Sequence, residues 1–133
     1  MNDTQANPSP EELQAAIDRW VQKAQHRVDQ NNAGHPFPPN QIICDRGPRY
    51  LKVQSRAVRT QPSGANVVAE SGSAFAFIDL KGGTVQGVPS KIGDVYKPDG
   101  CKGPAKWARG NIFDSDSSFG MQYVGPYGVQ NLR

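Results

Sequence analysis

The chain has 133 residues, a hydrophobic content of 36% and a mean hydropathy of −0.64. That length predicts a single domain (1–133), and the 14 glycines and 11 prolines indicate many turns rather than a protein of long helices. The net charge of +3 is uneven, because residues 41–133 hold 12 basic and 7 acidic side chains. So small a surplus argues against general nucleic-acid binding and suits a small anionic ligand better.

Neither a membrane segment nor an export signal is visible in the sequence. No apolar run reaches the roughly eighteen residues that a transmembrane helix needs, and the first ten residues are polar. Cys44 and Cys101 have no CxxC partner, which predicts free thiols and no zinc site. We therefore expect a soluble cytoplasmic protein without a bound metal or cofactor.

The first predicted element is a helix over residues 10–30, after a flexible N-terminus over residues 1–9. Ser9 is suited to cap this helix, Pro10 to occupy its first position and Glu12 to reach back to the cap. Apolar residues follow at helical spacing: Leu13, Ile17, Trp20, Val21, Ala24 and Val28. So large a stripe must be buried, either against the chain's own sheet or against a partner's helix. We expect it to form part of a subunit interface, which predicts at least a dimer.

The remaining chain predicts a proline-rich connector over residues 31–48 and an antiparallel sheet over residues 49–133. Pro104 and Gly110 bracket a stretch that resembles a short helical turn near residues 104–109. The expected strands cover residues 49–59, 66–70, 73–80, 94–97 and a kinked final strand within 119–133, with a mobile loop at 81–93. The fold class is therefore α+β, one long helix on a sheet of about five strands.

Catalysis has little support in the sequence, so we expect no enzyme. His26 lies on the polar side of the helix, and His35 lies in the connector without a nearby acid. Cys101 has Lys102 beside it, but a turn cysteine is the simpler interpretation. No spacing places two of the later carboxylates on one face; these are Asp79, Asp94, Asp114 and Asp116.

Basic and aromatic residues gather late in the chain and suit a nucleotide. Arginine offers a planar fork for phosphate, tryptophan a flat face for a base, and asparagine an edge that pairs with adenine. The set comprises Lys97, Lys102, Lys106, Trp107, Arg109 and Asn111, followed by Tyr123, Tyr127 and Arg133. The alternative is that Trp107 packs in the core while the lysines form a solvated edge.

Several motifs resemble a family of small tailed-phage proteins that are often described only as hypothetical. The resemblance runs from the helix to the last residue, and its most specific block is Gly93 to Asp114, which contains Pro-Ala-Lys-x-x-Arg-Gly-Asn-Ile-Phe-Asp. The other matching motifs are Arg49-Tyr50, Phe77-Ile78-Asp79 and the Gly-Pro-Tyr-Gly ending that runs to Arg133.

Within these phage proteins, the chain resembles the Thoeris anti-defence sponges. That resemblance implies a protein of the host cytoplasm that sequesters a cyclic ADP-ribose-type immune signal without cleaving it; some members of the family also bind cyclic oligonucleotides. It also implies a homo-oligomer, a dimer or a hexamer. Carried over by position, it makes Arg109 and Asn111 polar ligands, Phe77 or Trp107 a stacking ring, and Arg27 a contribution from a partner; Lys97 joins this ligand set.

The chain departs from the family pattern at two places. The usual short turn is replaced by residues 81–93, and Trp107 stands where a small residue or histidine is common. The longer loop is able either to close over a ligand or to block it, so the identity of the ligand stays open. A phage interaction module that binds a host protein through the helix and connector is the alternative function.

Overall fold

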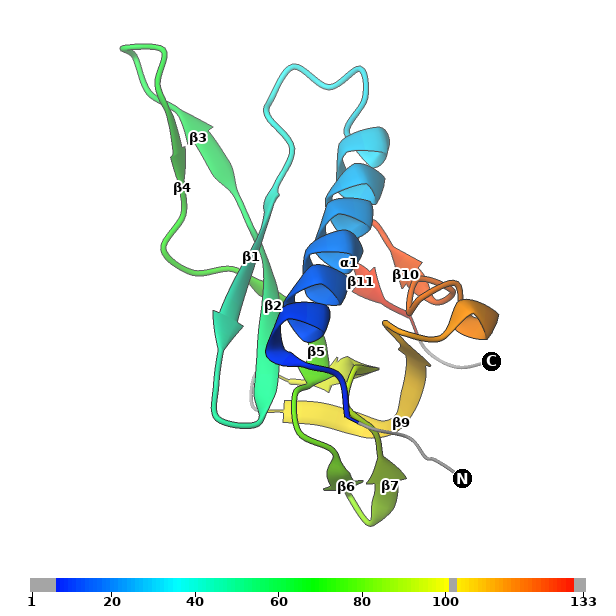
Figure 1. The fold of residues 1–133 in the computed structure, drawn as a ribbon. Coiled ribbons are helices and arrows are strands. Elements are labelled where there is room, and N and C mark those ends of the chain that lie inside the picture. Colours follow the sequence, from blue (N-terminus) through cyan, green and yellow to red (C-terminus); the bar gives the residue numbers. More distant parts are fainter. Residues whose placement is uncertain (1–6, 101–102, 131–133) are drawn as a thin grey trace.

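The computed structural model describes residues 7–100 and 103–130. It confirms the α+β class, with one long helix packed on a five-stranded antiparallel sheet (Figure 1). The strands of this sheet, in spatial order, are β1 (Gln41–Arg46), β2 (Tyr50–Arg56), β5 (Ser73–Asp79), β8 (Asp94–Asp99) and β9 (Gly103–Asn111). β1 and β9 are therefore the two edges of the sheet.

Helix α1 (Pro10–Asn31) begins as its sequence predicts and ends one residue later. The Ser9 hydroxyl accepts a hydrogen bond from the Glu12 amide at 3.1 Å, and the Ser9 amide donates to the Glu12 carboxylate at 2.8 Å. This reciprocal pair satisfies two amides that the first helical turn leaves without partners. The N-terminal region 1–9 was expected to be flexible, and its residues 1–6 lie outside the described part of the chain.

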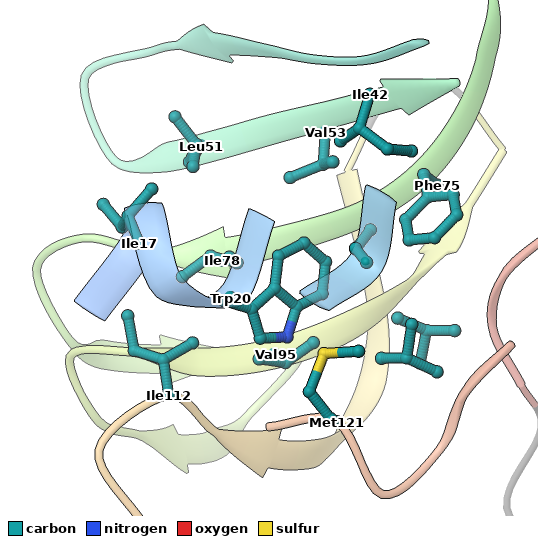
Figure 2. Close-up of a cluster of buried hydrophobic side chains, with 14 of the residues drawn as sticks. Ile17, Trp20, Ile42, Leu51, Val53, Phe75, Ile78, Val95, Ile112 and Met121 are labelled. Carbon is teal, nitrogen blue, oxygen red and sulfur yellow. The ribbon is translucent and has the colours of Figure 1, made fainter. Parts of the chain in front are cut away.

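The apolar stripe of α1 covers the chain's own sheet. Trp20 is at the centre of the resulting core, with its ring edge-on to Phe75 at 6.2 Å between centroids and its indole nitrogen donating to the Gly120 carbonyl at 3.0 Å (Figure 2). Leu13 and Val21 pack at the border of this core. Most of the stripe is therefore buried against the chain's own sheet, which is one of the two outcomes expected; its part in a subunit interface and the oligomeric state stay predictions.

The connector predicted over residues 31–48 is wrong in its second half, where β1 lies. Only Ile42 of this strand is buried, so the alternation that marks a strand is weak, and the neighbouring prolines and Gly47 obscure it. β1 pairs with β2 in an antiparallel register that joins Gln41 to Arg56 and Arg46 to Leu51. The sheet therefore begins at residue 41 rather than 49.

The short helical turn predicted near residues 104–109 is also wrong, because these residues belong to β9. Pro104 is tolerated there since an edge strand leaves some amides unpaired, and Gly110 adopts a φ of 146° that makes a bulge rather than a helix end. The short helical turn of this protein is η1 (Ser115–Ser117), capped by the Asp114 side chain.

Three small hairpins complete the fold: β3 (Val58–Thr60) with β4 (Asn66–Val68), β6 (Gly83–Val85) with β7 (Val88–Ser90), and β10 (Val124–Gly125) with β11 (Gly128–Val129). The loop predicted at 81–93 is thus mostly a hairpin. Gln86 and Gly87 both have positive φ, 49° and 83°, which is the geometry of a tight two-residue turn. The final strand predicted within 119–133 is a hairpin of two-residue strands, and residues 131–133 lie outside the described part.

The core between α1 and the sheet is continuous and closely packed. Figure 2 shows Trp20 and Ile17 of the helix facing the sheet, among Leu51, Val53 and other strand residues. Met121 and Ile112 close the side nearer the C-terminal segment. In the described part of the chain, no helix combines the length and the apolar character that crossing a membrane requires.

Candidate anion-binding site on strand β9

The β8–β9 pairing is irregular at the place where the predicted ligands lie. Tyr96 pairs with Ala108 and Pro98 with Pro104, so residues 105–107 of β9 lie opposite Lys97 alone. A second irregularity separates the Ala108 pair from the pair of Asp94 with Asn111. Bulges of this kind bend an edge strand and redirect its side chains, and they are frequent beside binding sites. We name Lys97, Lys106, Trp107 and Arg109 the β9 bulge cluster.

Arg109 is the unusual member of this cluster, because it is a buried cation. Its side chain is 9% exposed, and its Nη1 donates a hydrogen bond to the Trp107 carbonyl. Its Nε is buried and has no hydrogen-bond partner. Among residues 7–100 and 103–130, no carboxylate lies within ion-pair distance of it. Burial consequently lowers the pKa of this guanidinium from its ordinary value.

Trp107, whose backbone carbonyl accepts from Arg109, has its side chain on the surface. Its side chain is 53% exposed, so the interpretation of Trp107 as a core residue is wrong. The Lys106 ammonium lies 5.4 Å from the centroid of its ring, a cation–π contact. Lys106 is exposed and Lys97 is half-buried. The cluster thus combines three cations with one accessible aromatic face.

The structure places the other predicted ligands elsewhere. Asn111 donates to the Ile92 carbonyl at 3.0 Å and to the Asp94 carboxylate at 2.9 Å, and its side-chain oxygen accepts from the Phe113 amide. Its hydrogen bonds thus hold the loop before β8 against the end of β9. A ligand role for Asn111 requires these bonds to be exchanged and stays a prediction.

The contacts of Phe77 and Arg27 are likewise with other parts of the fold. Phe77 is buried among Val85, Tyr96 and Tyr50, beneath the β6–β7 hairpin. Arg27 on α1 donates to the Met121 carbonyl at 3.1 Å and also to the Val124 carbonyl. Each side chain supports the fold of one protomer, and their ligand roles stay predictions.

Most of the residues considered for catalysis lie on separate segments or already hold part of the fold through hydrogen bonds. His26 and His35 are both exposed on separate segments. The Asp94 carboxylate is occupied by Asn111 and by the Lys91 amide, while Asp114 caps η1. Of the remaining residues that the sequence singled out, Cys101, Lys102 and Arg133 lie outside the described residues. Within the described ranges, no three His, Cys, Asp or Glu side chains form a metal-binding group.

A second polar centre, around Asp79, was not recognised from the sequence. Asp79 is fully buried at the end of β5 and accepts hydrogen bonds from Arg49 at 3.2 Å and from the amides of Lys81 and Gly82 at 3.0 and 2.8 Å. The Ser90 hydroxyl of β7 also donates to it, and the Tyr96 hydroxyl donates to Ser90 at 2.7 Å. This Asp79 hub fastens the β6–β7 hairpin to the sheet.

The hub keeps Asp79 ionised despite its burial. Burial by itself raises the pKa of the carboxyl group, but the hydrogen bonds from Arg49, Ser90, Lys81 and Gly82 outweigh it and hold the pKa below the ordinary value of 3.8. Arg49 responds in the opposite direction, since its hydrogen bond to Asp79 raises its pKa. The sequence signal for this hub is the polar Asp79 that ends a buried apolar strand.

Comparisons of this chain with models of protein families, with curated proteins and with solved structures found no match.

Proposed function

We propose that this protein captures an anionic nucleotide at the β9 bulge cluster and holds it without cleaving it. The supporting observation is Arg109, a buried guanidinium with an unpartnered Nε and no carboxylate near it in the described chain. A largely buried cation without a counter-ion costs folding free energy, because it has lost part of its hydration. A phosphate supplies both the missing negative charge and the missing acceptors.

The neighbours of Arg109 suit the rest of a nucleotide. Trp107 presents an exposed ring on which a base is able to stack. Lys97 and Lys106 add positive charge on the two strands that flank the bulge. A phosphate group near the guanidinium and a base on the indole together describe a nucleotide rather than a bare anion.

In the form that the phage-protein resemblance implies, the ligand is a cyclic ADP-ribose-type immune signal and the protein is an anti-defence sponge of the host cytoplasm. Such a ligand carries two phosphates and an adenine. Sequestration requires only that the protein exceeds the signal and releases it slowly. No turnover is needed for this task, so the proposal is a binding protein and not an enzyme.

A thermal-shift panel of cyclic ADP-ribose isomers and cyclic oligonucleotides tests the capture. At least one nucleotide is expected to raise the melting temperature, and calorimetry then gives its affinity. The matched control is Lys91→Leu, which removes one exposed positive charge away from the cluster and is expected to leave binding unchanged. A panel without any shift, together with a stable complex with a host protein, would instead support the interaction-module alternative.

Incubation with excess nucleotide tests whether the ligand is cleaved. The ligand released by heating is expected to be intact on chromatography. A new product that exceeds one equivalent per subunit, and that disappears in Asp94→Asn or Asp114→Asn, would contradict the binding-only proposal.

A further inference from the structure

Two aromatic side chains are far more exposed than the other large apolar side chains of the described residues. Phe37, in the connector that leaves α1 (Figure 1), is 77% exposed, and Tyr127 in the β10–β11 hairpin is 84% exposed. Trp107 follows at 53%. Burial of an aromatic ring is favourable, so two rings left this open at one place indicate a surface that a ligand covers.

Both aromatic residues are tied to the C-terminal end of α1 through two consecutive asparagines. The Asn31 side-chain amide donates to the Tyr127 hydroxyl at 3.1 Å, and the Asn32 side-chain amide donates to the Phe37 carbonyl at 2.8 Å. The His35 backbone amide also donates to the Asn32 carbonyl at 3.0 Å. Because consecutive Cα atoms are about 3.8 Å apart, both segments lie at the same end of the helix. We name Asn31, Asn32, His35, Phe37 and Tyr127 the helix-end patch.

Proline restricts the backbone that carries each of the two rings. Phe37 lies between Pro36 and Pro38. Tyr127 follows Pro126 in the turn of the β10–β11 hairpin. Proline fixes its own φ and also restricts the residue before it. Segments held in this way lose little conformational entropy when a ligand binds, so they are suited to present a ring to one.

The two segments that carry the rings contain no aspartate, glutamate, lysine or arginine. These segments are residues 30–41 and 119–130, in a chain with 15 basic and 12 acidic side chains. Just outside them on α1, Arg27 donates to two backbone carbonyls, and the Asp29 carboxylate accepts from Gln25 at 3.0 Å. Arg56, which pairs across the sheet with residue 41, donates to Gln54 at 3.0 Å. The charges that border the patch thus have partners in the fold, and the patch favours an uncharged ligand over an anion.

The polar groups of the helix-end patch match the hydroxyl groups of a sugar. The side-chain oxygens of Asn31 and Asn32 accept no hydrogen bond from the described residues, and the Tyr127 hydroxyl, which accepts from Asn31, keeps its own proton to donate. A sugar hydroxyl also donates and accepts, so it pairs with either kind of group. The C–H groups on one face of a pyranose ring are apolar and stack on the electron-rich face of an aromatic ring.

We propose that the helix-end patch binds a neutral oligosaccharide, with sugar rings stacked on Phe37 and Tyr127 and hydroxyl groups bonded to the side chain of Asn31. A nucleotide is disfavoured, because its phosphate finds no free cation in these two segments. An apolar pocket of a partner protein is disfavoured too, because it would bury the asparagine amide without a hydrogen-bond partner. The patch shares no residue with the β9 bulge cluster, so it is separate from nucleotide capture.

Calorimetry of the full chain with maltopentaose, cellopentaose and chitopentaose, each up to about 10 mM, tests the site. At least one of these sugars is expected to bind, and Phe37→Ala and Tyr127→Ala are each expected to weaken it at least tenfold. Phe113→Ala is the matched control, because it removes an exposed aromatic ring outside the patch and is expected to leave the sugar affinity unchanged. Circular dichroism checks that all three variants remain folded.

Conservative variants and salt provide independent readouts. Phe37→Tyr keeps an aromatic ring at this position and is expected to retain the sugar affinity that Phe37→Ala loses. Tyr127→Phe keeps the ring but loses the hydrogen bond from Asn31, so its affinity is expected to lie between those of the wild type and Tyr127→Ala. Added salt is expected to leave the affinity unchanged, because no ion pair contributes to binding.

Three results would overturn the oligosaccharide site. The first is a wild-type protein that binds none of the three sugars. The second is sugar binding that Phe37→Ala and Tyr127→Ala leave unchanged, or that Phe113→Ala weakens equally. The third is tighter binding of an acidic oligosaccharide, tetragalacturonate, with an affinity that falls as salt is added.

Discussion

Two buried polar centres of this protein differ in one respect, the presence of a counter-charge. At the Asp79 hub, a fully buried carboxylate receives an ion pair and several hydrogen bonds. At the β9 bulge cluster, the buried Arg109 has one carbonyl acceptor and an unpartnered Nε. A satisfied buried charge is part of the structure, whereas an unsatisfied one is a cost that a binding function explains.

Removing the carboxylate from the satisfied centre has the largest expected effect. Asp79→Ala leaves Arg49, Ser90 and two amides without their acceptor, and it is expected to lower the free energy of unfolding by about 3–5 kcal/mol. Denaturant unfolding followed by circular dichroism measures this. Asp99→Ala, which removes an exposed carboxylate from β8, is the control and should change stability by no more than about 0.5 kcal/mol.

Substitution of Arg109, the unsatisfied buried charge, should change the affinity for the nucleotide. Arg109→Leu is expected to weaken the capture of whichever nucleotide the wild type binds at least tenfold, since a charge-assisted bond contributes about 1.5–3 kcal/mol. Arg109→Lys keeps the charge without the planar fork, so its affinity for the nucleotide is expected to lie between those of the wild type and Arg109→Leu. Wild-type affinity in Arg109→Leu, measured by calorimetry, would make the residue purely structural.

Trp107 should separate binding from stability. Loss of base stacking in Trp107→Ala is expected to weaken binding by about 1–3 kcal/mol. Because the side chain is more than half exposed, stability is expected to change by no more than about 0.5 kcal/mol. A large loss of stability with unchanged affinity would show that this ring belongs to the fold instead.

Lowering the pH should reduce the contribution of the Asp79 hub to the free energy of unfolding, by less than the substitutions above. The pKa of folded Asp79 lies below its ordinary value of 3.8, so its contribution is fully present above about pH 4 and is lost as the pH falls through the lowered pKa. The free energy of unfolding should therefore fall in this window more steeply for the wild type than for Asp79→Asn. If the free energy of unfolding falls equally steeply with pH in both proteins, the ionised Asp79 does not stabilise the fold as described.

The sequence predicts the elements whose signals are local and strong. The Ser9 capping box and the stripe around Trp20 locate α1 to within one residue at its end. β1 and β9 could not be predicted in the same way, because edge strands have weak alternation and tolerate Pro104 and Gly110. Those same two residues also occur at helix ends, which is why β9 resembled a helical turn.

The candidate site was predictable in part. Residue types alone indicate Arg109, Trp107, Lys106 and Lys97, and the β8–β9 register places Lys97 opposite the part of β9 that carries Lys106 and Trp107. Asn111 has the right chemistry, but its hydrogen bonds to Ile92 and Asp94 depend on a loop that no local pattern reveals. The hub around Asp79 depends on contacts between residues far apart in sequence, which spacing cannot indicate.

The stability of Arg109→Leu without any ligand tests the central claim most directly. If Arg109 is a buried cation kept for an anion, an apolar side chain of similar shape should leave the free energy of unfolding unchanged or raise it by up to about 2 kcal/mol. Denaturant unfolding of this variant beside the wild type, in phosphate-free buffer, gives the answer. A loss of about 2 kcal/mol or more would show that the guanidinium is satisfied within the fold and would contradict the account.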